Sequence, residues 1–478
     1  MPTLRLVVSA RCVALAGCLC ALGGCSPTFT SPADDDILAS IATQGESPQP
    51  VNQWPGWRGG AAHGVTSYTL PTHWDRNRGV QWVVDVPGRG NSSPVVWDDR
   101  ILLTSTIGSG DDAQAAVLCF DRTSGELLWK RTVGATHGAT HGKNGYASAT
   151  VATDGQRVVA SFGDLGLVCF DLDGNRQWHE RLAPMQHKWG SASSPVLLGN
   201  LVVQLCDNEG GSFIAAVNKH TGQGVWRTQR NSAGCWTTPV VVQVGDDPGR
   251  FELVVNGTSS SDGSDGMIIA YDPANGEPLW RVRGTTDIPC PTMIVGDGLL
   301  VSSSGGNGPV IAIRPGGRGE ATDSAVVWRQ PVGGPYVPTG VVHRGMLFMV
   351  ADGGVASAWR LQDGTPLWSK RLRGTFSASL LAAGDHVYAV SEQGTVYVLA
   401  ADAEFKLIAA NRLAEPCLAT PAPIEGALIL RTETQLWCIV GDEPQRVAEV
   451  PADTSPESPS DAPTVPVSIP APPDADVR

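Results

Sequence analysis

The chain has 478 residues, of which 42% are hydrophobic and 17% charged, and its formal net charge is −13 at pH 7. This acidity argues against a nucleic-acid-binding surface, and the length exceeds that of a usual single domain. About four of the negative charges fall in residues 451–478, which hold five acidic side chains and one arginine.

The first 25 residues predict export from the cytoplasm. An apolar run from Cys12 to Leu22 follows two arginines; it is too short to span a bilayer but suits a secretory signal peptide. The strings LAGC, ending at Cys18, and LGGC, ending at Cys25, both look like bacterial lipoprotein cleavage boxes. Cys25 is the favoured lipidation site, because choosing Cys18 would leave Arg11 inside the apolar core. The alternative is a plain signal peptide with incidental cysteines.

Residues 26–50 are rich in Ser, Pro and Asp, a composition typical of a flexible tether. With a lipid on Cys25, this tether would hold the protein at an envelope membrane without a transmembrane helix.

A tryptophan-ended hairpin pattern recurs along the region 52–442. An apolar residue, a polar turn with glycine and a tryptophan appear in this order in FDRTSGELLW, FDLDGNRQW, VNKHTGQGVW, YDPANGEPLW and WRLQDGTPLW. Trp82 and Trp328 match only the tryptophan half. The seven tryptophans are spaced by 47, 49, 48, 54, 48 and 40 residues, a period typical of a four-stranded propeller blade.

A second recurring signal, a small polar pair before an apolar strand, marks eight blade starts: NSSPVVW, YASATVA, SASSPVLL, CWTTPVVV, CPTMIV, YVPTGVV, FSASLLA and CLATPAPI. The last start leaves room for only three strands, whereas Val80–Val86 is an outer strand without a blade. Pairing the two would close the ring and protect its edges. We therefore predict an all-β, eight-bladed β-propeller of four-stranded antiparallel blades.

In this scheme each tryptophan lies between adjacent blades, where burial of its ring contributes several kcal/mol. The turn glycines allow a positive φ, and the Asp or Asn of the turn bonds to turn amides. Blade 7 has AEFKLIAANRL at this place and lacks the tryptophan, so it should form the loosest junction.

The segment 451–478 contains eight prolines and few residues to bury, and we expect it to be disordered and acidic.

No metal site is expected. His137 and His141 are four residues apart, but GATHGATHG is glycine-rich and reads as a loop. DNEGG, starting at Asp207, and SDGSDG could chelate calcium but are more typical of solvated turns.

Cys235 and Cys290 precede neighbouring blades, so a disulfide between them is conceivable in an oxidising envelope. The sequence does not decide whether this disulfide forms.

The repeats in CFDRTSGELLW and AYDPANGEPLW resemble blades of the pyrroloquinoline-quinone-type (PQQ-repeat) β-propellers. The strings WPGWRGGAAHGV, HGKNGYASATVATDG, WGSASSPVLLGNLVVQLCD and EPCLATPAPIEGALILRTETQLWCIV are similar to bacterial envelope propellers. That family is described as resembling the B subunit of the outer-membrane β-barrel assembly machine, itself a lipoprotein. The resemblance implies an exported protein, anchored at the periplasmic face of the outer membrane, that binds envelope proteins.

Two further functions remain as alternatives. Quinoprotein dehydrogenases of this fold use PQQ, calcium, an aspartate base and, in many, a disulfide between adjacent cysteines. This chain has no adjacent cysteines, so we expect no catalysis and no cofactor, with PQQ and calcium only under this alternative. The other alternative is binding of an envelope carbohydrate.

A partner would bind where the loops entering the innermost strands, and those between the second and third strands, ring one mouth of the channel. We call this ring of loops the rim. Exposed aromatic residues are typical interface anchors, although Trp236 and Phe376 could equally seal blade contacts. The candidate rim residues are His141, Lys143, Asn144, Tyr146, His187, Trp189, Asp207, Trp236, Tyr336 and Phe376. We therefore predict a monomeric, non-catalytic scaffold that binds envelope proteins. Outer-membrane protein assembly is the role that the resemblance implies for it.

Overall fold

The structure, a computed structural model, describes residues 52–60, 62–245, 250–257, 266–286, 290–413 and 415–441. The predicted signal peptide with Cys25, the tether, the proline-rich tail and most of SDGSDG lie outside these residues. Within the described ranges, no helix has the length and apolar character of a membrane span.

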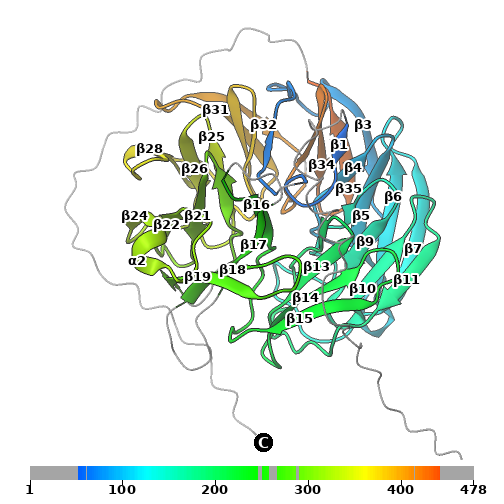
Figure 1. The fold of residues 1–478 in the computed structure, drawn as a ribbon. Coiled ribbons are helices and arrows are strands. Elements are labelled where there is room, and N and C mark those ends of the chain that lie inside the picture. Colours follow the sequence, from blue (N-terminus) through cyan, green and yellow to red (C-terminus); the bar gives the residue numbers. More distant parts are fainter. Residues whose placement is uncertain are drawn as a thin grey trace, which may run out of the picture. The chain divides into compact units, whose positions relative to one another are not determined.

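Eight sheets succeed one another along the chain and form a ring (Figure 1), which confirms the predicted eight-bladed β-propeller. Blade 1 consists of β4 (Val95–Trp97), β5 (Arg100–Ile107), β6 (Gln114–Asp121) and β7 (Leu127–Ala135), and blade 2 of β8 (Ala152–Thr153), β9 (Val158–Ser161), β10 (Leu167–Phe170) and β11 (Arg176–Glu180). Blade 3 consists of β12 (Val196–Leu198), β13 (Leu201–Cys206), β14 (Phe213–Asn218) and β15 (Gly224–Gln229), and blade 4 of β16 (Val240–Gln243), β17 (Phe251–Asn256), β18 (Gly266–Tyr271) and β19 (Pro278–Thr285).

Blade 5 consists of β20 (Ile294–Gly296), β21 (Leu299–Ser303), β22 (Val310–Ile313) and β24 (Val326–Gln330), and blade 6 of β25 (Val341–His343), β26 (Met346–Val350), β27 (Val355–Arg360) and β28 (Pro366–Arg371). Blade 7 consists of β29 (Leu381–Ala383), β30 (His386–Val390), β31 (Thr395–Ala400) and β32 (Leu407–Arg412), and blade 8 contains β33 (Ala422–Ile424), β34 (Ala427–Arg431) and β35 (Gln435–Ile439). All eight predicted blade starts precede an innermost strand.

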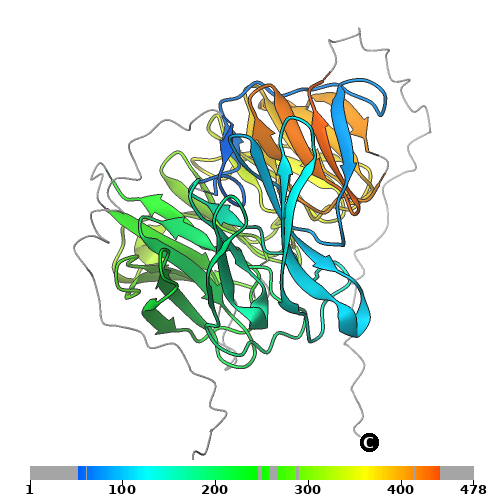
Figure 2. The same cartoon turned by 90° about the vertical axis from the view of Figure 1, so that its right-hand side faces the viewer.

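The N-terminal strand β3 (Val80–Asp85) completes blade 8 by pairing antiparallel with β35. Trp82 lies opposite Cys438 and Val84 opposite Leu436. In Figures 1 and 2 the blue β3 accordingly lies beside the orange strands of the last blade. The predicted closure of the ring by the two ends of the fold is confirmed.

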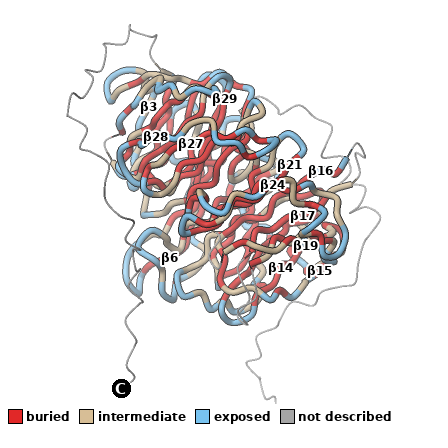
Figure 3. The backbone as a smooth tube through the Cα atoms, turned by 90° about the vertical axis from the view of Figure 1, so that its left-hand side faces the viewer, coloured by how far each residue is buried: buried red, intermediate tan, exposed pale blue. Residues whose placement is uncertain are grey.

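The buried residues follow the strands, and the exposed residues gather at turns (Figure 3). Apolar clusters join neighbouring blades: Val117 of blade 1 packs with Val168 of blade 2, and Val301 of blade 5 with Leu347 of blade 6. The core is therefore shared between blade pairs, as in other quasi-one-dimensional repeat proteins.

The small polar residue that marks each blade start takes part in a closed ring of hydrogen bonds. In every blade its amide N–H donates to the hydroxyl oxygen of the matching residue in the next blade, over 2.9 to 3.1 Å. The order is Ser93, Thr150, Ser194, Thr238, Thr292, Thr339, Ser379, Thr420 and back to Ser93. The sequence pattern that marks the blades is thus also a device that joins them.

Replacing Thr420 by valine should lower the free energy of unfolding by about 1–3 kcal/mol, because the buried Ser379 amide would lose its acceptor without a change in side-chain shape. Urea denaturation would measure the change. Thr132→Val, on the exposed face of β7, is the matched control and should stay within about 0.5 kcal/mol of the parent. Equal effects of the two substitutions would contradict a role for the ring.

The blade tryptophans lie between blades, as predicted, and also bond to the neighbouring turn. Six of them donate their Nε1–H to a turn carbonyl of the next blade: Trp82 to Arg122, Trp129 to Leu172, Trp178 to Lys219, Trp226 to Pro273, Trp328 to Leu361 and Trp368 to Asp402. The turn glycine is required by close approach as well as by φ, since a Cβ on Gly222 would lie 2.8 Å from the Trp178 ring.

Two junctions depart from this pattern. Trp280 donates to Glu252 of its own blade at 2.7 Å, because an insertion with β23 (Gly319–Glu320) and α2 (Thr322–Ala325) replaces the tight turn of blade 5. Between blades 7 and 8, where the tryptophan is missing, the segment 67–79 buries Tyr68, Leu70 and Trp74 in the shared core. This segment occupies the space that the missing tryptophan would fill. That the junction between blades 7 and 8 is the loosest of the ring stays a prediction.

The N-terminal segment 52–66 lies inside the ring of innermost strands. Its strand β1 (Gln53–Trp54) pairs with β4 of blade 1, and its strand β2 (Val65–Thr66) pairs in parallel with β29 of blade 7. Between them, the Pro55 carbonyl accepts the Thr153 amide of blade 2 at 2.8 Å. These main-chain contacts therefore join the segment to blades 1, 2 and 7.

Arg58 anchors this segment. Its buried guanidinium donates to the carbonyls of Thr339, Gly340 and Leu380 at 2.7 to 3.2 Å, and to two carbonyls of its own segment. Burial lowers the pKa of Arg58 to about 9. Gly64 is required at a φ of 70°, because a Cβ there would lie 2.7 Å from Arg58 Nη2. The string WPGWRGGAAHGV thus encodes a segment that bonds to blades 1, 2, 6 and 7.

Candidate functional site

Three loops of blades 2, 3 and 7 meet at the rim. The loop that enters blade 2 carries His141, Lys143 and Asn144, and it is a loop rather than a helix, as predicted. Lys143 Nζ lies 2.7 Å from Glu392 Oε1 of blade 7, and Asn144 Nδ2 donates to the Trp189 carbonyl at 2.9 Å. The His141 amide donates to the same carbonyl at 3.1 Å. These predicted rim residues are therefore brought together, and their loop reaches over part of the mouth.

Tyr146 holds the same loop in shape, since its hydroxyl donates to the Gly138 carbonyl at 2.6 Å. Its position is on the rim, but the contact is internal to the loop.

His187, Trp189 and Trp236 form an aromatic cluster between blades 2, 3 and 4. The ring centroids of Trp189 and Trp236 lie 5.7 Å apart, and those of His187 and Trp236 lie 4.9 Å apart. Trp236 Nε1 donates to the Gly190 carbonyl at 2.8 Å, which fixes its ring. Trp189 remains 37% exposed, and Lys188 Nζ lies over its face, 5.3 Å from the centroid. The cluster offers one accessible indole on a fixed support.

The imidazole of His187 is only 4% exposed, and its Nδ1 lies 3.9 Å from Glu209 Oε2. Burial lowers the pKa of His187, although Glu209, a hydrogen bond to the Cys235 backbone and Asp207 act in the opposite direction. A buried imidazole therefore supports the aromatic cluster beneath the rim.

A cavity of about 910 Å³ opens beside this cluster, between blades 2 and 3. Its volume is at the upper end of the range typical of ligand pockets. The walls come from the loop entering blade 2, from the turn Phe162–Leu165, and from the segment 181–191. No repeat or motif in the sequence indicates this cavity, because its walls are two loops and the short 3-10 turn Gly163–Leu165.

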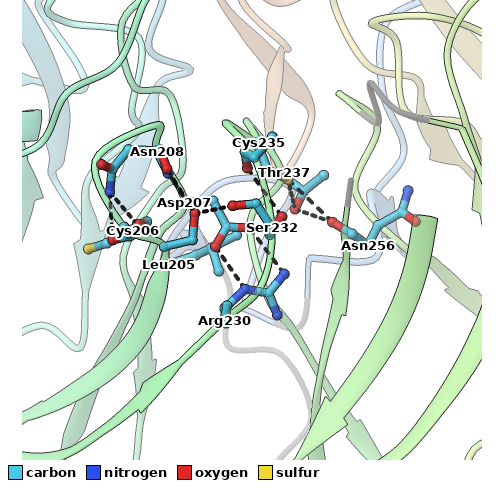
Figure 4. A network of polar contacts seen from close by, with 12 residues as sticks. Leu205, Cys206, Asp207, Asn208, Arg230, Ser232, Cys235, Thr237 and Asn256 are labelled. Atoms are coloured by element: carbon cyan, nitrogen blue, oxygen red, sulfur yellow. Dashed lines mark hydrogen bonds and ion pairs between the residues drawn. The ribbon is translucent and has the colours of Figure 1, made fainter. Parts of the chain in front are cut away.

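Asp207 lies in the loop between the second and third strands of blade 3, as predicted, but its side chain is buried and is not exposed on the rim. Its carboxylate is fully buried and accepts two bonds from Arg230, at 2.8 and 3.0 Å, as Figure 4 shows. Arg230 also donates to the Tyr271 hydroxyl. Burial by itself would lower the pKa of Arg230, but the Asp207 carboxylate outweighs this effect and raises it. A turn that looked solvated in sequence is thus part of a buried ion pair.

Phe376 is fully buried, so of the two roles left open for it the structure shows the sealing role. Tyr336 is 40% exposed on the loop that enters blade 6, and its amide donates to Asp352. It occupies a different part of the same mouth from the aromatic cluster.

Sequence reasoning missed Lys188, Glu209 and Glu392. Glu392 lies between the second and third strands of blade 7, a loop type already assigned to the rim, so the blade register could have found it. Glu209 lies between the second and third strands of blade 3, within DNEGG, and Lys188 lies in the loop that enters blade 3, so the same register points to both.

The described residues do not fit the calcium and quinone arrangement of the quinoprotein dehydrogenase alternative. Asp207 uses both of its carboxylate oxygens to accept hydrogen bonds from Arg230. Cys235 and Cys290 are free thiols, and Cys235 Sγ lies 3.2 Å from Thr237 Oγ1. Within the described ranges, no three His, Cys, Asp or Glu side chains are grouped as metal ligands would be.

Comparison with known proteins places the chain among propellers. A family model described as outer membrane protein assembly factor BamB matches residues 72–243 and 264–405. No curated protein matches the chain. Among solved structures, BamB from Moraxella catarrhalis is 16% identical with a TM-score of 0.55, and the match covers 77% of this chain and 100% of that one.

Two enzymes have similar structures. Quinohemoprotein alcohol dehydrogenase from Comamonas testosteroni is 13% identical with a TM-score of 0.64, and the match covers 86% of this chain and 85% of that one. A europium-containing methanol dehydrogenase is 10% identical with a TM-score of 0.60, and the match covers 84% and 92%. At these identities the likeness shows the fold alone.

Proposed function

Because the chain belongs to the family described as outer membrane protein assembly factor BamB, we propose that it is a non-catalytic propeller that binds envelope proteins through its rim. The observation that carries the proposal is Trp189, whose indole is 37% exposed and packs against the fixed ring of Trp236. Trp189 also lies in one of the strings that resemble the family. Tryptophan is strongly enriched among residues that dominate binding energy. Family membership suggests an envelope-associated, periplasmic location, and lipidation at Cys25 with a role in outer-membrane protein assembly is the finer form of the proposal.

The state of the channel supports a binding role over catalysis. The segment 52–66 covers the inner edges of β4 and β29, and the Lys143–Glu392 pair ties the loop over part of the opposite mouth to blade 7. A partner that binds on the rim does not need to enter the channel. A cofactor deep in the channel would compete for space with the segment 52–66 and with the loop that carries Lys143.

Photo-crosslinking in cells tests the rim. A benzoylphenylalanine at position 189 or 336 should capture envelope proteins, whereas the same group at position 385, on the turn after β29 at the other mouth, should not. The pair Trp189→Ala and Lys143→Ala should reduce capture from position 336 severalfold without lowering the melting temperature, because both side chains are partly exposed.

Equal capture from positions 336 and 385, or capture unaffected by the paired substitution, would move the binding surface off the rim. Stoichiometric binding of PQQ with calcium, together with reduction of a dye by an alcohol or sugar, would overturn the non-catalytic part of the proposal.

A further inference from the structure

Both ends of the described propeller lie at the mouth opposite the rim. In each blade the innermost strand begins at the rim, so the turn that follows this strand lies at the other mouth. In blade 1, for example, β4 ends at Trp97, and the turn Asp98–Asp99 leads back into β5. We call the mouth formed by these turns, and by the turns between third and fourth strands, the second mouth.

The N-terminal end is fixed at the second mouth by hydrogen bonds to two blades. The Asp98 amide of blade 1 donates to the Asn52 carbonyl at 3.1 Å, and the Glu425 amide of blade 8 donates to Asn52 Oδ1 at 3.3 Å. Gln53 Nε2 donates to Asp98 Oδ1 at 3.2 Å. Asp98 and Glu425 both belong to turns that follow an innermost strand. The chain before Asn52 therefore joins the propeller at this mouth.

The C-terminal end lies at the same mouth. β35 starts at the rim, after the loop that follows β34, and its last residue Ile439 pairs with Val80, the first residue of β3. The Val440 and Gly441 amides both donate to the Gly79 carbonyl, at 2.9 and 3.0 Å. The described chain therefore neither enters nor leaves the propeller through the rim.

The two mouths are separated by the length of a strand. β5 has eight residues, so the rim lies about 25 Å from the second mouth at a rise of about 3.3 Å per residue. Residues 26–51 separate Cys25 from Asn52, and a random coil of this length would have a root-mean-square end-to-end distance of about 30 Å. A membrane that holds a lipid on Cys25 would thus be nearer, on average, to the second mouth than to the rim.

The charges at the second mouth do not favour direct adhesion to anionic lipid. Asp98 and Glu425, which flank Asn52, are both exposed, and like charges repel. The attachment of the chain at Asn52, and not an attraction between this surface and the headgroups, would therefore determine which mouth faces the membrane.

We propose that the second mouth faces the lipid surface in which Cys25 is anchored, and that the rim, with Trp189 and Tyr336, is presented to the aqueous side. The inference rests on the proposed function and deepens it, because it states which partner segments the rim can reach. These are segments that stand clear of the membrane by about one strand length or more. A partner surface at the headgroups would meet the turns of the second mouth instead.

Energy transfer to a membrane dye tests this orientation. The full chain, extracted in detergent from the membranes of expressing cells, would carry a coumarin amino acid at one position and would be inserted into preformed phosphatidylcholine vesicles with an acceptor-labelled headgroup. Positions 173 and 385 are exposed on turns of the second mouth, and positions 137 and 336 are exposed on the rim. Transfer should be at least about twofold more efficient from 173 than from 137, and from 385 than from 336, because a strand length separates each pair.

The pairs are matched because 137 and 173 belong to blade 2, and 336 and 385 to the neighbouring blades 6 and 7, so a tilt of the ring would not produce both differences. Equal transfer from the two mouths, or more transfer from the rim, would overturn the inference and leave the proposed function standing. Cys25→Ser should abolish vesicle binding and transfer. A Cys25→Ser chain that binds and transfers as the parent does would remove the anchor and this inference, whereas capture of envelope proteins from position 189 would still support the rim.

Discussion

Replacing Arg230 by methionine is expected to lower the free energy of unfolding by about 3–5 kcal/mol, because it leaves a buried carboxylate without its partner. Asp207 is fully buried and accepts two bonds from Arg230. Removing the guanidinium also removes the donor to the Tyr271 hydroxyl. Chemical denaturation at pH 7 would measure the loss.

A double variant tests whether the uncompensated buried charge causes this loss. Asp207→Asn with Arg230→Met should lose less than the single variant at pH 7, because the amide needs no cationic partner. A single variant as stable as the parent, or a double variant that loses as much as the single one, would contradict the buried ion pair.

Replacing Trp226 by alanine should cost about 3–5 kcal/mol, because the change opens a cavity between blades 3 and 4. The ring is 5% exposed, and its Nε1–H donates to the Pro273 carbonyl at 3.0 Å. A Cβ at Gly276 would lie 2.4 Å from the same ring, so the contact is close.

Trp368→Ala is the control for this prediction, since Trp368 makes the matching bond to Asp402 but is only partly buried. Its loss should be clearly smaller when both variants are unfolded in urea. Equal losses would mean that the hydrogen bond, and not the buried ring, provides most of the stabilisation.

The repeating features of the fold could be predicted because they recur. The blade starts gave the count of eight, and the incomplete last blade identified Val80–Val86 as its missing strand. The hydrogen-bond ring through Thr420 and Ser93 was not predicted, because a small polar pair in sequence does not reveal which backbone group it meets.

The features that occur once were harder to foresee. Arg58 bonds to Thr339, Gly340 and Leu380, more than 280 residues away, and no periodicity connects them. Asp207 looked like a turn residue because its partner Arg230 is 23 residues further on, directly after β15. The cavity wall at 181–187 has neither repeat nor regular structure. Single contacts of this kind depend on the three-dimensional arrangement, which local propensity does not specify.

The N-terminal segment has a consequence for the order in which the protein can fold. Residues 52–85 leave the ribosome before any blade, yet β2 pairs with β29 and β3 pairs with β35, near the end of the chain. Early blades, with β1 on β4, can form in turn from local contacts, but β2 and β3 must wait for strands near the end of the chain. Such long-range pairings slow folding, and domains with incomplete partners expose surfaces that aggregate. The chain would therefore need β2 and β3 kept unpaired until the last two blades are available to them.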